Sequence, residues 1–320
     1  MTTIRYFSLG RHAMKNALRY AGVQNGDSVM LPSFICRDLL SAVAELGAKT
    51  VFYEVDKALK PVQLDPKINA KVIVAVNYFG FAQDLGPYNE YCKQTGAIII
   101  EDNAHGFLSR DENKNLLGTR AKFGITSFRK SLRVQDGAIL ATSLNDHEID
   151  EQLDYIDAPV SKRNSLLFLL SSFESRTRFP VVALGQSISR AIRLVSKGSA
   201  LPKPDLTAET TIPGLANPHL QSVVSLKALD ENREVLRRRN LYQLLKSQVV
   251  ATGATMIFAD LPDNTCPYGM PVYANEESRK KLAKVARQNR VTLMSWPELP
   301  NSTISTTPGF YKQVWLLNFQ

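Results

Sequence analysis

Two patterns of apolar positions alternate between residues 10 and 145. Helical spacing of apolar side chains predicts helices over 11–23, 37–48 and 85–96. Short apolar runs rich in Val and Ile predict strands within 25–34, 50–55, 71–80 and 97–104. A strand that is apolar on both faces is typical of a parallel sheet covered by helices. The sequence therefore predicts an α/β fold with a mostly parallel sheet.

Polar residues stand where two of these predicted strands end. One run closes with Glu101, Asp102 and His105, and another closes with Asn77 and Tyr78. In open parallel sheets, ligands gather at the carboxyl ends of the strands. These side chains are therefore candidates for the walls of a site.

The pattern after residue 145 is less regular. Apolar-faced helices are expected at 165–173 and 181–195, within a helical insertion or connection at 146–212. Both packing on the main domain or a partner subunit and contact with a membrane surface suit this basic, apolar pair, and we favour packing. From 213 onward a helix pair at 220–249, a further helix at 276–289 and flanking strands predict a small α+β domain. We thus expect a large domain at 1–212 and a small one at 213–320.

Composition and charge narrow the class of protein. The 320 residues are 44% apolar and 22% charged, which excludes a disordered chain. Its cysteines, Cys36, Cys92 and Cys266, form no CxxC pair, so neither a disulfide framework nor a metal site is expected. No signal peptide or transmembrane segment is recognisable, and we expect a soluble, cytoplasmic protein. The net charge of +9 includes one dense cluster, the arginines at 237–239, but no nucleic-acid motif accompanies it. Anionic small molecules are the favoured partners.

Three candidate positions for chemistry stand out in the residues alone, each with an ordinary structural explanation beside it. Lys130 lies beside Arg129, so it is either a solvated lysine or an amine whose pKa is lowered by like charge, as a nucleophile requires. Asp102 is either a cap or turn residue or an anion that holds a positive ligand ring. Gly10 opens a helix, whose free N–H groups suit a phosphate.

Taken in order, the segments SLGRHAM (8–14), NGDSVMLPSFICRDLLSAVAELGAKTVFYEVD (25–56), IVAVNYFGFAQDL (73–85), IIIEDNAHGF (98–107) and SFRKSLRVQDGA (127–138) resemble the DegT/DnrJ/StrS family. Its members are nucleotide-sugar aminotransferases of fold type I that use pyridoxal 5'-phosphate (PLP). The resemblance is close over 5–145 and looser over 213–320. It implies a large PLP-binding domain, a small C-terminal domain and a homodimer.

The resemblance assigns roles near the PLP ring. Asp102 matches the aspartate that pairs with the pyridine nitrogen, and Lys130 matches the Schiff-base lysine, with Gly137 in register seven residues later. His105 falls where the family has glutamine or histidine near the phenolic oxygen. Cys36 occupies the place of a stacking aromatic residue, for which Phe34 is the candidate substitute.

The resemblance also assigns the phosphate end. Gly10, Arg11 and His12 match the start of the phosphate-binding helix, where Arg11 replaces a threonine and offers a guanidinium instead. The family's phosphate-binding serine matches Ser127 if residues are deleted just before Lys130. A residue from the second subunit often reaches the phosphate, and Asn217 is its candidate counterpart.

The function implied is transfer of an amino group from an amino acid, usually glutamate, to a keto sugar nucleotide for polysaccharide, lipopolysaccharide or related sugar biosynthesis. One alternative is a PLP-dependent sugar dehydratase of the same family, but those enzymes replace the lysine with histidine. Another is a binding or scaffold protein, suggested by the departures at Arg11, Cys36 and the serine position. No nucleic-acid or metal partner is expected.

Overall fold

The computed structural model describes residues 2–149, 154–157 and 205–320. Of these, the residues up to Ile156 and from Ala208 onward form one compact unit. The helices expected at 165–173 and 181–195, with most of the predicted segment 146–212, lie outside the described residues.

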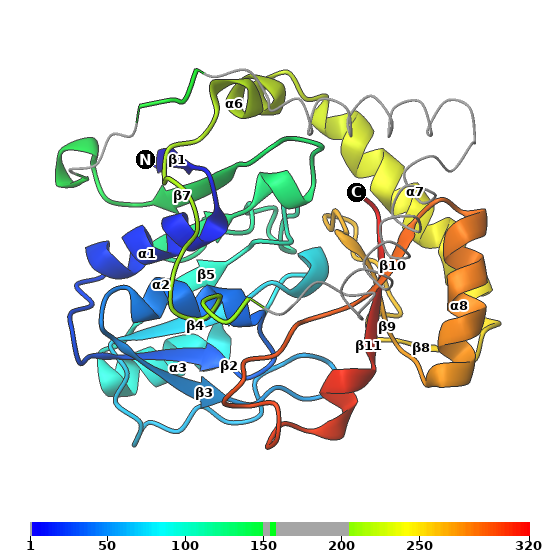
Figure 1. The fold of residues 1–320 in the computed structure, drawn as a ribbon, viewed down its shortest axis with the longest axis horizontal. Coiled ribbons are helices and arrows are strands. Elements are labelled where there is room, and N and C mark those ends of the chain that lie inside the picture. The colour runs from blue at the N-terminus through cyan, green and yellow to red at the C-terminus, as the bar shows by residue number, and fades with distance from the viewer. Residues whose placement is uncertain (1, 150–153, 158–204) are drawn as a thin grey trace, which may run out of the picture. The chain divides into compact units, whose positions relative to one another are not determined.

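A seven-stranded sheet occupies the N-terminal half (Figure 1). Its strands are β1 (Thr3–Phe7), β2 (Ser28–Pro32), β3 (Lys49–Tyr53), β4 (Val72–Val76), β5 (Ile98–Asp102), β6 (Phe123–Thr126) and β7 (Ala138–Thr142). They lie in the order β1-β7-β6-β5-β4-β2-β3. Strands β6, β5, β4, β2 and β3 pair in parallel, while β7 is antiparallel to both of its neighbours. The predicted α/β fold with a mostly parallel sheet is confirmed.

Helices pack on this sheet through their apolar faces. The helices are α1 (Gly10–Tyr20), α2 (Leu40–Ala44) and α3 (Gly86–Thr95), and the short 3₁₀ turns are η1 (Arg37–Leu39), η2 (Tyr78–Gly80), η3 (Phe128–Lys130) and η4 (Asp146–Glu148). Helix α1 packs on β6 and β7, α2 on β3, and α3 on β5. All five residues of β4 are buried, which explains its unbroken apolar run.

Strand β6 was not predicted, and its glycine shows why the signal is weak. A Cβ on Gly124 would approach the backbone of Gly118 to 2.0 Å, so this position excludes a side chain that would mark a strand. The backbone of Gly118 passes close to β6 at this point, and β6 itself is only four residues long.

A second, antiparallel sheet lies in the C-terminal region, with strand order β10-β11-β9-β8. Its elements are α6 (Leu220–Lys227), α7 (Glu231–Val250), β8 (Thr255–Met256), β9 (Gly269–Tyr273), α8 (Glu276–Gln288), β10 (Thr292–Ser295), η5 (Gly309–Gln313) and β11 (Val314–Asn318). Helices α7 and α8 pack against each other and against this sheet (Figure 1).

The two sheets share one continuous hydrophobic core. Tyr268 donates its N–H to the carbonyl of Phe79, 2.8 Å away, and the Tyr311 hydroxyl accepts the N–H of Val55 at 2.9 Å. The division into domains at residue 213 stays a prediction. Among the described residues, no helix is long and apolar enough to cross a membrane.

Candidate active site

The carboxyl ends of three neighbouring parallel strands meet at one cavity. Asp102 is the last residue of β5, and the sheet pairs it with Val76 of β4 and Ile125 of β6. Asn77 and Ser127 follow those two strands. All five of these residues line the cavity, as parallel register at one sheet edge requires.

The structure brings most of the predicted site residues together here. The predicted residues that line the cavity are Gly10, Arg11, Asp102, His105, Ser127 and Lys130. Cys36, Asp38, Arg129 and Trp296 line it too. His12 and Phe34 do not, nor does Asn217, whose side chain donates to the carbonyl of Asp154 at 2.9 Å.

Asp102 is buried, with 5% of its surface exposed. One of its carboxylate oxygens accepts the N–H of Ala104 at 2.9 Å, which is the turn contact that its sequence position suggested. Burial raises the pKa of Asp102, and the positive charge of Lys130 opposes that rise. The residue therefore makes a turn and also presents a poorly hydrated anion to the cavity.

Lys130 ends the 3₁₀ turn η3, and its Nζ lies 3.3 Å from Nε2 of His105. Burial lowers the pKa of Lys130, an effect that the charges of Cys36 and Asp102 oppose. Of the two readings open from sequence, the structure favours the amine enclosed in a site. Gly137 makes room for the turn, because a Cβ there would lie 2.1 Å from the ring of Phe128 and its φ is +138°.

Two aromatic rings stack on His105. Tyr268 lies at 4.6 Å between ring centroids with planes 6° apart, and Phe79 lies at 5.6 Å with planes 18° apart. Trp296 meets the ring edge-on at 4.9 Å. Burial and the charge of Lys130 hold the pKa of His105 well below its usual value, so the imidazole is neutral, and its Nε2 lies within hydrogen-bond distance of Lys130 Nζ.

Sequence reasoning missed Tyr268 and Trp296 as site residues. Both come from the C-terminal region, more than 160 residues from His105 along the chain. The aromatic residues of PYGMPVY and SWPELP were the available signal, but nothing local indicates what these rings would pack against.

The phosphate end has the groups that an anion needs. Ser127 is 1% exposed, and its Oγ has no hydrogen-bond partner in the part of the chain that the structure describes. A Cβ built on Gly10, at the start of α1, would lie 4.0 Å from that oxygen. Nε of Arg129 is likewise buried without a partner among the described residues, and Arg11 lies 3.7 Å from Asp38. A hydroxyl, guanidinium groups and a helix N-terminus together suit a phosphate.

The remaining predicted contacts lie away from the cavity. The ring of Phe34 is fully buried and packs on Tyr311 at 4.8 Å and on Trp296 at 5.3 Å, while Cys36 forms the cavity wall. His12 is buried within α1, and burial lowers its pKa. Contacts of Phe34, His12 and Asn217 with a cofactor stay predictions.

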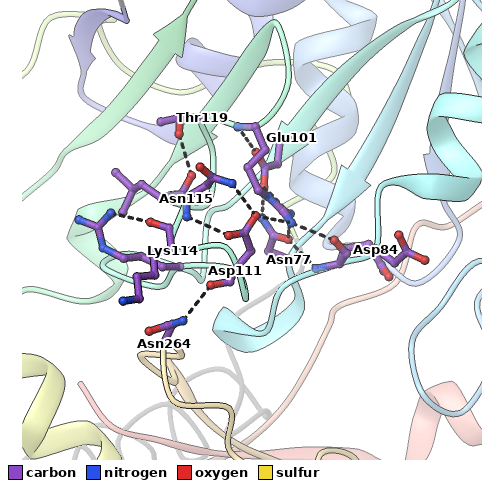
Figure 2. Close-up of polar contacts among 12 residues, drawn as sticks. Asn77, Asp84, Glu101, Asp111, Lys114, Asn115, Thr119 and Asn264 are labelled. Atoms are coloured by element: carbon purple, nitrogen blue, oxygen red, sulfur yellow. Dashed lines mark hydrogen bonds and ion pairs between the residues drawn. The ribbon is translucent and has the colours of Figure 1, made fainter.

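A buried network of polar side chains connects the carboxyl ends of β4 and β5 (Figure 2). Glu101 is fully buried and accepts the side-chain Nε of Arg120 at 2.8 Å and its backbone N–H at 3.0 Å. Asn77 donates to Glu101 at 2.7 Å and accepts from Arg120 at 3.0 Å. This network joins the ends of β4 and β5 to the loop that leads into β6, and so it fixes the backbone that carries Asp102.

Residues 6–166, half of the chain, match the DegT/DnrJ/EryC1/StrS aminotransferase family. The chain belongs to this family. The resemblance predicted from its motifs is therefore confirmed.

Relatives of the chain agree with this assignment. A pleiotropic regulatory protein of Geobacillus stearothermophilus is 29% identical over 160 residues, which are 48% of this chain and 42% of that protein. A GDP-perosamine synthase of Escherichia coli O157:H7 is 22% identical over 315 residues, covering 93% of this chain and 81% of that enzyme. The chain spans only 36% to 42% of the length of three of the curated relatives it matches.

The fold has relatives among solved structures. A DegT/DnrJ/EryC1/StrS aminotransferase from Brucella abortus superposes with a TM-score of 0.63 at 16% identity, over 98% of this chain and 80% of that one. At this identity the likeness shows the fold, which is that of fold type I aminotransferases. The family implies PLP as the cofactor.

Proposed function

We propose that this family member is a PLP-dependent aminotransferase. It moves an amino group from an amino acid, glutamate by the family pattern, to a keto sugar carried on a nucleotide. Glutamate leaves as 2-oxoglutarate, and the sugar carbonyl becomes an amine. The observation that carries the proposal is the meeting of Lys130, Asp102 and His105 in one cavity at the sheet edge.

PLP supplies an aldehyde that condenses with amines and a ring that takes up electrons. Toward this group, the lowered pKa of Lys130 favours the neutral amine that would bind the aldehyde, and the same Nζ would move a proton at the substrate carbon. Asp102 holds a proton on the ring nitrogen, and its burial strengthens that pairing. Ser127, Arg11 and the first turn of α1 hold the phosphate.

A homodimer and the keto sugar nucleotide are parts of the proposal that rest on the family alone. The dehydratase alternative is disfavoured because the cavity holds a lysine where those enzymes have histidine. The scaffold alternative predicts a cavity that takes up no PLP. Oγ of Ser127, which has no hydrogen-bond partner among the described residues, speaks against it, since a buried hydroxyl without a hydrogen bond is costly unless a ligand satisfies it.

The test is a visible absorption spectrum of the purified protein with added PLP, followed by turnover with glutamate. The sugar substrates are a panel of GDP- and UDP-linked keto sugars, and formation of 2-oxoglutarate is measured. We expect the wild-type protein with PLP to show an absorption band above roughly 400 nm, which is typical of an amine bonded to the PLP aldehyde. K130A should lack this band. We also expect at least a roughly 1,000-fold loss of turnover in K130A. Absence of the band in the wild-type protein supports the scaffold alternative, and undiminished turnover in K130A refutes the aminotransferase.

A further inference from the structure

The arginine cluster at 237–239, the densest positive charge in the sequence, is not a free basic patch in the structure. Each arginine of this run on α7 donates to a backbone carbonyl of a different segment. Arg237 binds the carbonyl of Phe319 at 2.8 Å, and Arg239 binds that of Thr265 at 2.9 Å. Arg238 binds the carbonyl of Ser131 at 2.7 Å. The cluster therefore ties α7 to three other segments of the chain.

Arg238 is the most deeply buried of these arginines, with 1% of its surface exposed. Its Nε donates to Glu234, one helical turn earlier, at 2.6 Å, so its charge is compensated within α7. The guanidinium is then free to direct Nη2 at Ser131, the residue that follows Lys130. A planar, charge-compensated fork of this kind holds its target in a defined direction.

Gln320 makes the complementary contact from the end of the second sheet. Its side-chain Nε2 donates to the carbonyl of Arg129 at 3.0 Å and to that of Leu132 at 3.1 Å. With Arg238, it binds the carbonyls of residues 129, 131 and 132, on both sides of Lys130.

The turn that carries Lys130 has little structure of its own. Turn η3 is three residues long, and a 3₁₀ turn of this length leaves its last carbonyls without internal partners. Arg238 and Gln320 bind the carbonyl of Arg129 inside this turn and those of Ser131 and Leu132, which follow it. These contacts connect the turn and the residues after it to the C-terminal region.

We propose that Arg238 and Gln320 are positioning residues for Lys130. By holding the three carbonyls around it, they direct the Lys130 amine toward His105 and the cavity. The chemical role of that amine rests on the function proposed above, whereas its placement does not. A displacement of a reacting group by about 1 Å can cost roughly 100-fold in rate, so such a support matters for turnover.

The placement is tested by competitive labelling of Lys130 with acetic anhydride across a pH series, read by mass spectrometry. The primary variant is Q320M, which keeps the length of an exposed side chain and removes its N–H donors. R238K keeps a charge beside Glu234 without the planar fork. R239M is the matched control, because Arg239 binds carbonyls of the same kind in a different loop.

We expect the apparent pKa of Lys130 to rise by about half a unit or more in Q320M and R238K, as the amine leaves its enclosed position. R239M should match the wild-type protein. In the assay with glutamate, Q320M should lower kcat more than it changes KM.

An unchanged profile in Q320M overturns the positioning role, and Q320M decides alone if R238K fails to fold. An equal shift in R239M overturns it too, because the effect is then a general loosening of the C-terminal region. The expected labelling pattern in a protein that binds no PLP overturns the proposed function and leaves the positioning intact.

Discussion

Glu101 and Asp102 are neighbours on β5, and their side chains leave the strand on opposite faces. On the one face, Glu101 is fully buried and receives hydrogen bonds from Arg120 and Asn77. On the other face, Asp102 is almost as buried, but among the described residues it accepts a single hydrogen bond, from the N–H of Ala104, and burial raises its pKa.

The same contrast extends to the residues around each carboxylate. The face of Glu101 pairs its polar groups within the protein, whereas the cavity side contains Ser127 Oγ and Arg129 Nε without partners among the described residues. Unpaired buried polar groups cost stability, and a structure retains them where a ligand satisfies them. The comparison separates a network that holds the fold from a cavity that is prepared for a ligand.

The largest expected effect comes from breaking the paired face. R120M leaves the buried carboxylate of Glu101 without its cation, and we expect the free energy of unfolding to fall by about 3–5 kcal/mol. D102N should change this free energy by less than about 1 kcal/mol. Burial already disfavours the charged form of Asp102, as its raised pKa indicates, so a neutral amide removes little stability. Urea unfolding followed by circular dichroism measures both.

The double variant E101M/R120M is the control for this prediction. Replacing both charges by apolar side chains removes the uncompensated charge, so at least half of the lost stability should return. If D102N costs as much as R120M, the two carboxylates are equally structural and the comparison fails.

A smaller effect separates two buried serines. Oγ of Ser109 donates to the carbonyl of Cys266 and accepts its N–H, both at 2.9 Å, whereas Oγ of Ser127 has no partner among the described residues. S109A should lower the free energy of unfolding by about 1–3 kcal/mol, and S127A should leave it unchanged or raise it. Thermal unfolding monitored by calorimetry compares the two.

The effects of the two serine variants on PLP binding should follow the opposite order, and a PLP titration measures them. S127A should weaken PLP binding by about 10-fold, the value of one hydrogen bond to a charged acceptor, while S109A leaves PLP binding unchanged. A loss of PLP affinity in S109A alone would reverse the roles assigned to the two serines.

The smallest effect is in the pH dependence of stability. The pKa of His105 is lower in the folded protein than in the unfolded chain, so the unfolded state takes up the proton first as the pH falls below about 6.5. His105 thus contributes a loss of stability toward acid of at most about 1.4 kcal/mol per pH unit. H105Q should remove this contribution, as measured by urea unfolding between pH 5 and 7.

His147 is an exposed histidine of η4 and provides the matched variant, H147Q. His12 is also buried with a lowered pKa, so part of the acid-side slope remains in H105Q. A slope as steep in H105Q as in the wild-type protein, or an equal reduction in H147Q, would show that His105 is not the buried neutral imidazole of the site.

Much of the large sheet could be predicted because its signals are local. The apolar runs that form β4 and β5, and the polar residues that end them, are contiguous in sequence. The motif around Lys130, together with Asp102, then indicated a PLP site. Strand β6 escaped prediction because Gly124 and its short length remove the usual pattern.

The aromatic support of the site could not be predicted in the same way. Tyr268 and Trp296 reach His105 only because the second sheet packs on η2, and no pattern near either residue specifies that contact. The dense positive charge at 237–239 is visible in the sequence. The carbonyls that these arginines bind could not be predicted, because they lie on distant segments.

By itself, the sequence determined the α/β class and the family and indicated the candidate site residues, because periodicity and motif spacing act over neighbouring positions. Only the tertiary structure decided which of these residues share a cavity, which carboxylate of β5 is paired, and what holds the Lys130 turn. Burial, hydrogen bonding and the pKa values that follow from them depend on contacts between distant segments, and such contacts exist only once the chain has folded.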